Sequence, residues 1–323
     1  MISEDTNYAP IILMAYNRDA HFKITLEALS LNINAINSSL YCYLDGPKDE
    51  DDSIAQEKII DIVNEYKKHF KQVEIIIRKK NFGLALNISQ AVTEIISIYE
   101  KVIVIEDDVV TSKSFIDFMN NALNFYEHDN RIWHIAAHSE INFEERKNEI
   151  YIWKVMNCWG WATWKNRWQH FEKNPEQLIN EFSEDMIRDF DLDGSGYFWY
   201  QVVANASKRI DTWAIFWYAT IFKNNGFCVN PYFSHTKNIG LDGSGAHCDI
   251  DKDRMRSQIL NHNGKFSGKN EIIEDTDLTS SIRNIYIARR TPLNYIKKAY
   301  ASRENLFKYI NKLLKFFTTK INN

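Results

Sequence analysis

The sequence has few cysteines and no long apolar run. The four cysteines are far apart and form no Cys-x-x-Cys pair: Cys42, Cys158, Cys228 and Cys248. This spacing indicates neither a disulfide framework nor a zinc site, and it favours a reducing compartment. No apolar segment approaches the roughly 20 residues needed to cross a bilayer, and the polar N-terminus is unlike a signal peptide. We therefore expect a cytoplasmic protein.

The chain also lacks a strong excess of either charge. Its 39 basic and 43 acidic residues leave a formal net charge of −4, which argues against a nucleic-acid binder. What the chain does have is length and apolar content. Its 323 residues, 45% of them hydrophobic, are enough for one large α/β domain or two small ones.

Short apolar runs alternate with helical stretches along the first third of the chain. The runs predict strands at 10–16, 39–45, 73–78 and 101–107, and the stretches between them predict helices at 20–36, 53–70 and 81–99. Strands this apolar indicate a mainly parallel sheet covered on both faces, whose ligands bind at the carboxyl ends of the strands. The sequence therefore predicts an α/β, Rossmann-like fold.

Three consecutive acids end the fourth predicted strand. An isolated acidic triplet is usually a solvated loop or the first turn of a helix. At the carboxyl edge of a parallel sheet, however, such acids can hold a hard divalent cation between the protein and a nucleoside diphosphate. The acids, and the strand ends expected beside them, are Glu106, Asp107, Asp108, Asn17, Arg18 and Asp45.

Several segments resemble, in order, one family of enzymes. "VIVIEDDVVTSKSFIDFM" is similar to the acidic metal motif of GT-A-fold, nucleotide-sugar-dependent glycosyltransferases, especially N-acetylglucosaminyltransferase I and its bacterial relatives. "APIILMAYNR" resembles their first strand and nucleotide loop, "YLDG" their second strand end, "NFGLALNI" the helix after the third strand, and "WGWATW" part of the acceptor half. The resemblance covers roughly residues 9–250 and implies a GT-A-type fold.

The resemblance implies an inverting, metal-dependent transfer of a sugar from a UDP-sugar. Asp108 is then the ligand of Mn2+ or Mg2+, while Glu106 and Asp107 contact ribose or the donor sugar. Arg18 and the adjacent Asn17 belong to the nucleotide loop, where Arg18 adds positive charge near the phosphates. Asp45 would accept a hydrogen bond from uracil, although it is equally well explained as a turn-forming acid before Gly46-Pro47.

The catalytic base departs from the family's motif. Relatives carry an acid just after a tryptophan, where this chain reads "DTWAIFW" and has Ala214. Asp211 serves instead, or the chain is naturally inactive, or Ala214 replaces a native acid. The retained aromatic neighbours Trp213 and Trp217 match a sugar-packing site and favour replacement, although such spacing also occurs in ordinary cores.

Tryptophans and glycines mark two further candidate segments. Trp159 and Trp161 are candidates for an acceptor-sugar cleft, with a buried helix and strand interface as the alternative. The glycine-rich stretch within 238–249 resembles the segment that closes over bound donor. From that segment, His247 could reach the diphosphate or the metal, or be a surface histidine.

The sequence divides into a transferase domain and a basic tail. We expect a GT-A domain at 1–250, with a nucleotide-binding half at about 9–125 and an acceptor half at about 126–250. A linker at 251–281 and a basic amphipathic helical tail at 282–323 follow. The tail docks on the domain or contacts an anionic membrane.

The predicted activity and its rivals follow from these segments. We expect transfer to a saccharide or lipid-linked saccharide, in the synthesis of a bacterial surface polysaccharide such as lipopolysaccharide or capsule. A sugar nucleotidyltransferase is the first alternative, but its glycine-rich phosphate loop is missing from "MAYNRDAHF". A catalytically inactive carbohydrate-binding homologue is the second.

Overall fold

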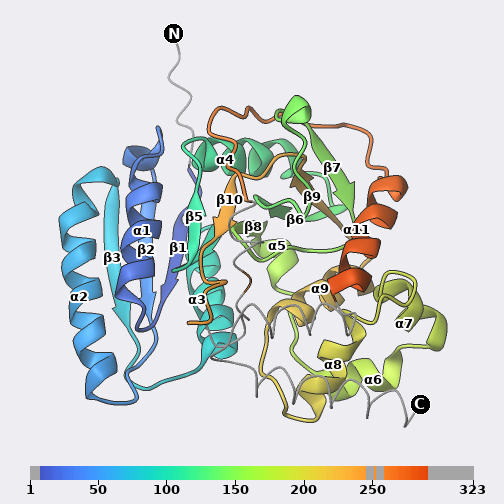
Figure 1. Ribbon diagram of the computed structural model, residues 1–323, viewed down its shortest axis with the longest axis horizontal. Coiled ribbons are helices and arrows are strands. Elements are labelled where there is room, and N and C mark those ends of the chain that lie inside the picture. Colours follow the sequence, from blue (N-terminus) through green and yellow to red (C-terminus); the bar gives the residue numbers. More distant parts are fainter. Residues whose placement is uncertain (1–7, 245–250, 252–257, 290–323) are drawn as a thin grey trace.

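A computed structural model describes residues 8–244, 251 and 258–289 of the chain. The predicted alternation of strands and helices is present (Figure 1). The elements are β1 (Ile11–Ala15), α1 (Asp19–Ser30), β2 (Ser39–Leu44), α2 (Glu50–Tyr66), β3 (Gln72–Ile77), α3 (Leu84–Ile98) and β4 (Lys101–Glu106).

Eight strands form one sheet in the order β3-β2-β1-β4-β8-β6-β9-β7. The added strands are β6 (Ile132–Ala136), β7 (Ile150–Trp153), β8 (Trp161–Trp164) and β9 (Phe227–Pro231). β3, β2, β1 and β4 are parallel, and β6 is parallel to β9, whereas β8 runs antiparallel to β4 and β6, and β7 antiparallel to β9. The predicted mainly parallel, Rossmann-like sheet is therefore confirmed.

Each face of the sheet carries its own hydrophobic core. In β4, Val102 and Val104 belong to one core, and Ile103 and Ile105 to the other, as the alternation of a strand requires. Buried residues of α3 and α9 (Ala214–Lys223) line the first core, while buried residues of α1, α2 and α4 (Phe115–Tyr126) line the second. Helices thus cover both faces, as predicted for a sheet of such apolar strands.

A two-stranded sheet lies directly after the acidic triplet. It pairs β5 (Val109–Thr111) antiparallel with β10 (Thr236–Asn238), and both are near the middle of the molecule in Figure 1. Along the chain, four further helices come between β8 and β9: α5 (Lys165–Trp168), α6 (Pro175–Glu181), α7 (Glu184–Phe190) and α8 (Trp199–Ala206). Helix α11 (Thr276–Arg289) follows β10. Short 3-10 turns occupy Ala35–Asn37, Lys67–His69 and Glu144–Arg146.

The first helix ends earlier than the sequence predicts. The expected helix at 20–36 stops at Ser30. The side-chain amide of Asn32 donates to the carbonyls of Ala28 and Leu29, both at 3.2 Å. These carbonyls would otherwise accept from the next helical turn, so the local bond of Asn32 ends the helix.

Helix α11 packs on the domain across the predicted boundary at 281/282. Leu278, Ile282 and Tyr286 are buried in the first core. The part of the predicted tail that is described, up to residue 289, is thus docked. The remainder, including any membrane contact, lies outside the described residues, and the division into domains stays a prediction. No helix in the part of the chain that the structure describes is long and apolar enough to cross a membrane.

Candidate active site

The acidic triplet lies where β4 ends, and Arg18 is its counter-ion. Arg18 precedes α1, and its guanidinium contacts both carboxylates that follow the strand. Its Nε is 3.2 Å from Asp107 Oδ2, its Nη2 also bonds Asp107 Oδ1, and its Nη1 is 2.9 Å from Asp108 Oδ2. Asp107 and Asp108 are buried, and one guanidinium is therefore the counter-ion of two carboxylates that water hardly reaches, which leaves a net charge of −1 when both are ionised.

Burial and like charge shift the protonation of these acids. Desolvation, with the charges of Asp108 and Asp107, raises the pKa of Glu106 to about 8. Desolvation also raises the pKa of Asp107 to about 6, although Arg18 opposes this shift. Burial disfavours the charge of Arg18, but the two aspartates outweigh it and raise the pKa of the guanidinium. Arg18 is therefore a permanent positive charge at the edge of the sheet.

Residues 236–242, hereafter the strap, cover Asp108. The backbone N–H of Ile239 donates to the Asp108 carbonyl at 2.8 Å, and Asn238 Nδ2 is 3.3 Å from Asp108 Oδ1. His21 of α1 bonds Asp242 at 3.0 Å. Residues 238–242 of the strap are the start of the predicted closing segment 238–249, and Asn238 and Ile239 contact Asp108. His247 lies outside the described residues.

Gly240 gives the strap its close approach. A Cβ at this position would lie 2.1 Å from Asp108 Oδ2 and 3.1 Å from Arg18 Nη1. No side chain fits there without a shift of the carboxylate or of the strap. The glycine is thus required by space over the acidic pair.

The carboxylate of Asp108 suits a cation that is shared with a ligand. Among the described residues, no three His, Cys, Asp or Glu side chains converge on a common point. Both Asp108 oxygens already face protein groups, Arg18 and Asn238. Carboxylate oxygen is nonetheless the donor that Mg2+ or Mn2+ prefers, and one carboxylate completed by phosphate oxygens is a common arrangement. The residues fit such a shared cation and not a resident metal centre.

Asp45 is occupied by the backbone of the next loops. Its Oδ1 accepts from the N–H groups of Gly46 (2.9 Å) and Phe82 (2.7 Å), and its Oδ2 accepts from Gly83 N–H (2.8 Å). The carboxylate therefore joins the end of β2 to the loop before α3. These contacts agree with one alternative from the sequence, in which Asp45 is a turn-forming acid. The other alternative, a hydrogen bond from uracil, stays a prediction.

Asp52 is a functional candidate that the sequence did not indicate. It is buried in the first turn of α2, and it accepts from Tyr16 Oη, from Asn17 Nδ2 (2.7 Å) and from Lys48 N–H (2.9 Å). It thus ties the loop after β1 to the loop after β2. Four consecutive acids at 49–52 suggest only a helix N-terminus, which hides this role.

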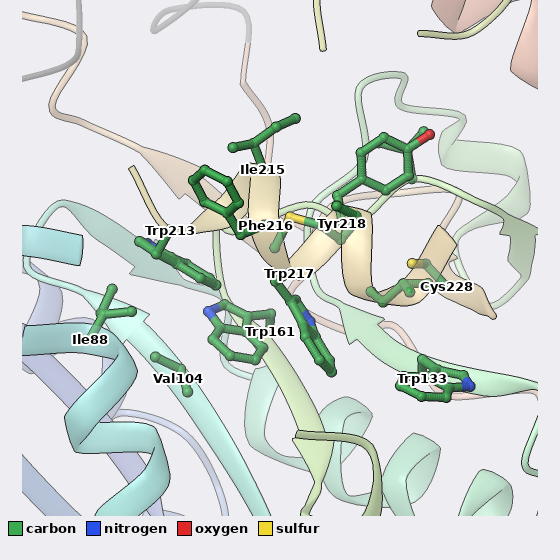
Figure 2. Packing of buried hydrophobic residues seen from close by; sticks show 14 of the residues in the cluster. Ile88, Val104, Trp133, Trp161, Trp213, Ile215, Phe216, Trp217, Tyr218 and Cys228 are labelled. Carbon is green, nitrogen blue, oxygen red and sulfur yellow. The ribbon is translucent and has the colours of Figure 1, made fainter. Parts of the chain in front are cut away.

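The predicted acceptor tryptophans have different surroundings. Trp159 is half-buried, with its ring centroid 4.5 Å from that of His138. Trp161, Trp213 and Trp217 are buried in the first core, where Trp161 and Trp213 stack at 5.0 Å (Figure 2). These three side chains therefore belong to a buried interface, which was the alternative to an acceptor cleft. Of the four tryptophans, Trp159 alone is partly exposed.

The two candidate base positions lie at the start of α9. Ala214 is the first residue of that helix, directly after Trp213. The carboxylate of Asp211 is exposed and forms an ion pair with Lys173. Asp211 thus lies in solvent, whereas the buried Trp213 and the first turn of α9 lie on the face of the sheet that carries Val104 of β4.

Comparisons with known proteins give weak structural likenesses. No family model and no curated protein sequence matches the chain. The galactosyltransferase LgtC, solved with donor and acceptor sugar analogs, is 10% identical, with 84% of this chain and 95% of that chain covered and a TM-score of 0.40. The mannosyltransferase PcManGT from Pyrobaculum calidifontis, solved with GDP-Man and Mn2+, is 9% identical over 68% and 71%, with a TM-score of 0.37.

A cytidylyltransferase from Leptospira borgpetersenii is similar to the same degree. It is 11% identical, with 62% of this chain and 94% of that chain covered and a TM-score of 0.34. Two classes of enzyme that use nucleotides therefore match comparably. At TM-scores this low, the likenesses carry no argument about activity, and the function has to be argued from the site.

Proposed function

We propose that the protein is a glycosyltransferase that uses a UDP-sugar. The observation that carries this proposal is the buried group of Arg18, Asp107 and Asp108 beneath the strap. It lies at the carboxyl edge of a parallel sheet, where such folds bind ligands. A diphosphate needs positive charge, which Arg18 would supply together with the cation that Asp108 would hold. A sugar needs carboxylate acceptors for its hydroxyls, and a transfer reaction needs water excluded, and the acids and the strap over them suit both needs.

Each member of the group has a distinct task in this proposal. Arg18 faces the leaving diphosphate, and Asp107 holds the guanidinium in place through two contacts. Asp108 is the residue that would hold Mn2+ or Mg2+ together with the diphosphate. When bound, the cation offsets the negative charge that grows on the leaving group. Glu106 and Asp107 contact the ribose or the donor sugar, and Asn17 belongs to the nucleotide loop.

The transfer is an inverting displacement at the anomeric carbon. The acceptor hydroxyl oxygen forms the new bond, the bond to the diphosphate breaks, and the hydroxyl proton passes to a base. We assign the base to position 214 in an active form of the enzyme, with Asp211 as the competing residue. Asp211 is accessible, and only its Oδ1 contacts Lys173 in the ion pair.

The acceptor is a saccharide or a lipid-linked saccharide in bacterial surface-polysaccharide synthesis. The partly exposed ring of Trp159 supports a sugar-binding face, because aromatic faces pack against the C–H groups of sugar rings. Peripheral membrane attachment is a separate proposal, which belongs to the tail beyond residue 289.

Calorimetric titration with UDP, with and without Mn2+, tests the donor site. We expect binding that Mn2+ strengthens, and we expect Asp108→Ala to abolish the effect of Mn2+. Asp51→Ala removes an exposed acid elsewhere and is the matched control. Equal UDP affinity in the Asp108 variant would refute the metal assignment. Release of pyrophosphate from UTP and a sugar 1-phosphate would instead identify a nucleotidyltransferase.

Two variants test the base. If position 214 is the base position, Ala214→Asp should raise turnover by about 10²–10⁴-fold with little change in UDP affinity. Asp211→Ala should then leave transfer unchanged. Full activity in the present chain that collapses in Asp211→Ala would show instead that Asp211 is the base. Transfer that neither change alters would place the base elsewhere.

A further inference from the structure

The orientation of the Asn17 side chain is determined by Asp52. Asn17 is exposed, directly precedes Arg18, and donates from Nδ2 to Asp52 Oδ1 at 2.7 Å. The other Asp52 oxygen accepts from Tyr16 Oη and from Lys48 N–H. All three partners are therefore donors, and the carboxylate is the shared acceptor at the junction of the first two loops.

An ionised carboxylate can only accept hydrogen bonds. Burial alone would raise the pKa of Asp52, but the bonds from Tyr16, Lys48 N–H and Asn17 outweigh it, and the pKa is lowered. The carboxylate is thus charged throughout the neutral range. The amide nitrogen of Asn17 must face it, and the carbonyl Oδ1 of Asn17 must point the other way.

The outward carbonyl of Asn17 is a hydrogen-bond acceptor next to Arg18. Within residues 8–244, 251 and 258–289, no group donates to Asn17 Oδ1. The acid that the sequence predicted for reading the base, Asp45, already accepts from three backbone N–H groups at the same edge. Asn17 Oδ1 is therefore free to accept a hydrogen bond from a ligand, whereas most of the accepting capacity of the Asp45 carboxylate is already taken by the backbone.

We propose that Asp52 is a positioning residue that sets the base preference of the nucleotide site through Asn17. The inference rests on the proposed nucleotide-sugar function. A carbonyl fixed in this orientation favours a ring that presents an N–H group. Uracil presents one at N3, whereas the N3 of cytosine is itself an acceptor and would face the carbonyl oxygen unfavourably. The site should therefore select uridine over cytidine diphosphates.

The substitution Asp52→Asn changes the hydrogen bonding of residue 52 while it keeps the size of the side chain. The new amide has nearly the same size, but it can either donate or accept, so it no longer dictates which end of Asn17 faces it. It also weakens the bond from Tyr16 Oη, because a neutral acceptor replaces a charged one. Asn17 can then turn its amide nitrogen outward, where it would suit cytosine.

The test is the ratio of UDP to CDP affinity, measured by calorimetry on the full chain. We expect the unaltered chain to bind UDP about 10-fold or more tightly than CDP, since leaving an acceptor facing an acceptor loses a hydrogen bond. Asp52→Asn should bring the ratio close to one. Asp51→Asn makes the same charge change on the same turn at an exposed side chain, and it should keep the original ratio.

Asn17→Ala provides a second route if Asp52→Asn does not fold. It removes the carbonyl at an exposed position and should also abolish the preference for UDP. An unaltered ratio in either folded variant would overturn the inference, as would equal UDP and CDP affinities in the unaltered chain. Binding of neither nucleotide by the unaltered chain would refute the proposed function itself, which is a different outcome.

Discussion

Gly240→Ala is a one-carbon test of the closed strap. The added Cβ would lie 2.1 Å from Asp108 Oδ2, so the carboxylate or the strap must retreat by about 1 Å or more to reach van der Waals contact. Asp108 Oδ2 is 2.9 Å from Arg18 Nη1, and Oδ1 is 3.3 Å from Asn238 Nδ2. A shift of that size breaks or lengthens both contacts.

The cost can be bounded from these contacts. Overpacking of a close-packed site costs about 1–3 kcal/mol. If Asp108 also loses Arg18, a mostly buried charge is left without its partner, which costs about 3–5 kcal/mol. We therefore expect Gly240→Ala to lower the free energy of unfolding by at least about 1 kcal/mol in urea titration, and to change UDP affinity because Asp108 has moved.

Gly194→Ala is the matched control for the loss of a glycine. Gly194 has φ of +77° and no heavy atom within 4 Å of the Cβ position, so its cost is only backbone strain of about 1–2 kcal/mol. We expect UDP affinity to stay unchanged there. If Gly240→Ala has full stability and unaltered UDP affinity, the strap does not lie on Asp108 in solution, and the closed arrangement is refuted.

Three further changes test the framework around the site. Asp45→Ala should lower the free energy of unfolding by about 1–3 kcal/mol, because three backbone N–H groups, one buried and two partly buried, lose their acceptor, and unaltered urea unfolding would contradict this. Burial lowers the pKa of both His134 and His235 to about 3 from 6.5. The unfolded chain then binds more protons than the folded protein between these values, so stability should fall as the pH falls through that window; urea titrations that are flat from pH 6.5 to 3 would refute it. Tyr286→Ala should cost about 3 kcal/mol or more, since this buried ring stacks on Tyr197 at 4.5 Å, and a melting temperature equal to that of the unaltered chain would show that α11 is not docked.

The fold could be predicted because its signals are local. Each of the first four strands is a short apolar run between polar stops, and the structure has β1, β2 and β4 within those runs and β3 displaced from its run by one residue, at Gln72–Ile77. The end of α1 could not be predicted, because it depends on where one side chain, Asn32, directs its amide. Boundaries of this kind are decided by single hydrogen bonds, which hydrophobic periodicity does not contain.

The site could be predicted only in its location. Strand ends that share an edge must be neighbours, and Arg18 accordingly contacts Asp107 and Asp108 although 89 residues separate it from the nearer one in sequence. The partners of Asp45 and Asp52 could not be predicted, because they are backbone N–H groups and side chains of other loops. The surroundings of the tryptophans could not be predicted either. A sugar cleft and a hydrophobic core have the same aromatic pattern in sequence, and Trp161 and Trp217 lie in the core.

Buried acids at this edge of the sheet divide into two groups by what they bind. Asp45 and Asp52 accept from backbone and side-chain donors of the loops after β1, β2 and β3, so the folded chain itself uses them. Asp108 instead faces Arg18 and the strap, contacts that a ligand can replace. Loss of activity therefore has different meanings in the two groups. At Asp45 it should accompany lower stability, because the bonds are made in the free protein. At Asp108 an exchange of partners leaves the framework of the loops intact, so binding should fall by more than the stability of the fold.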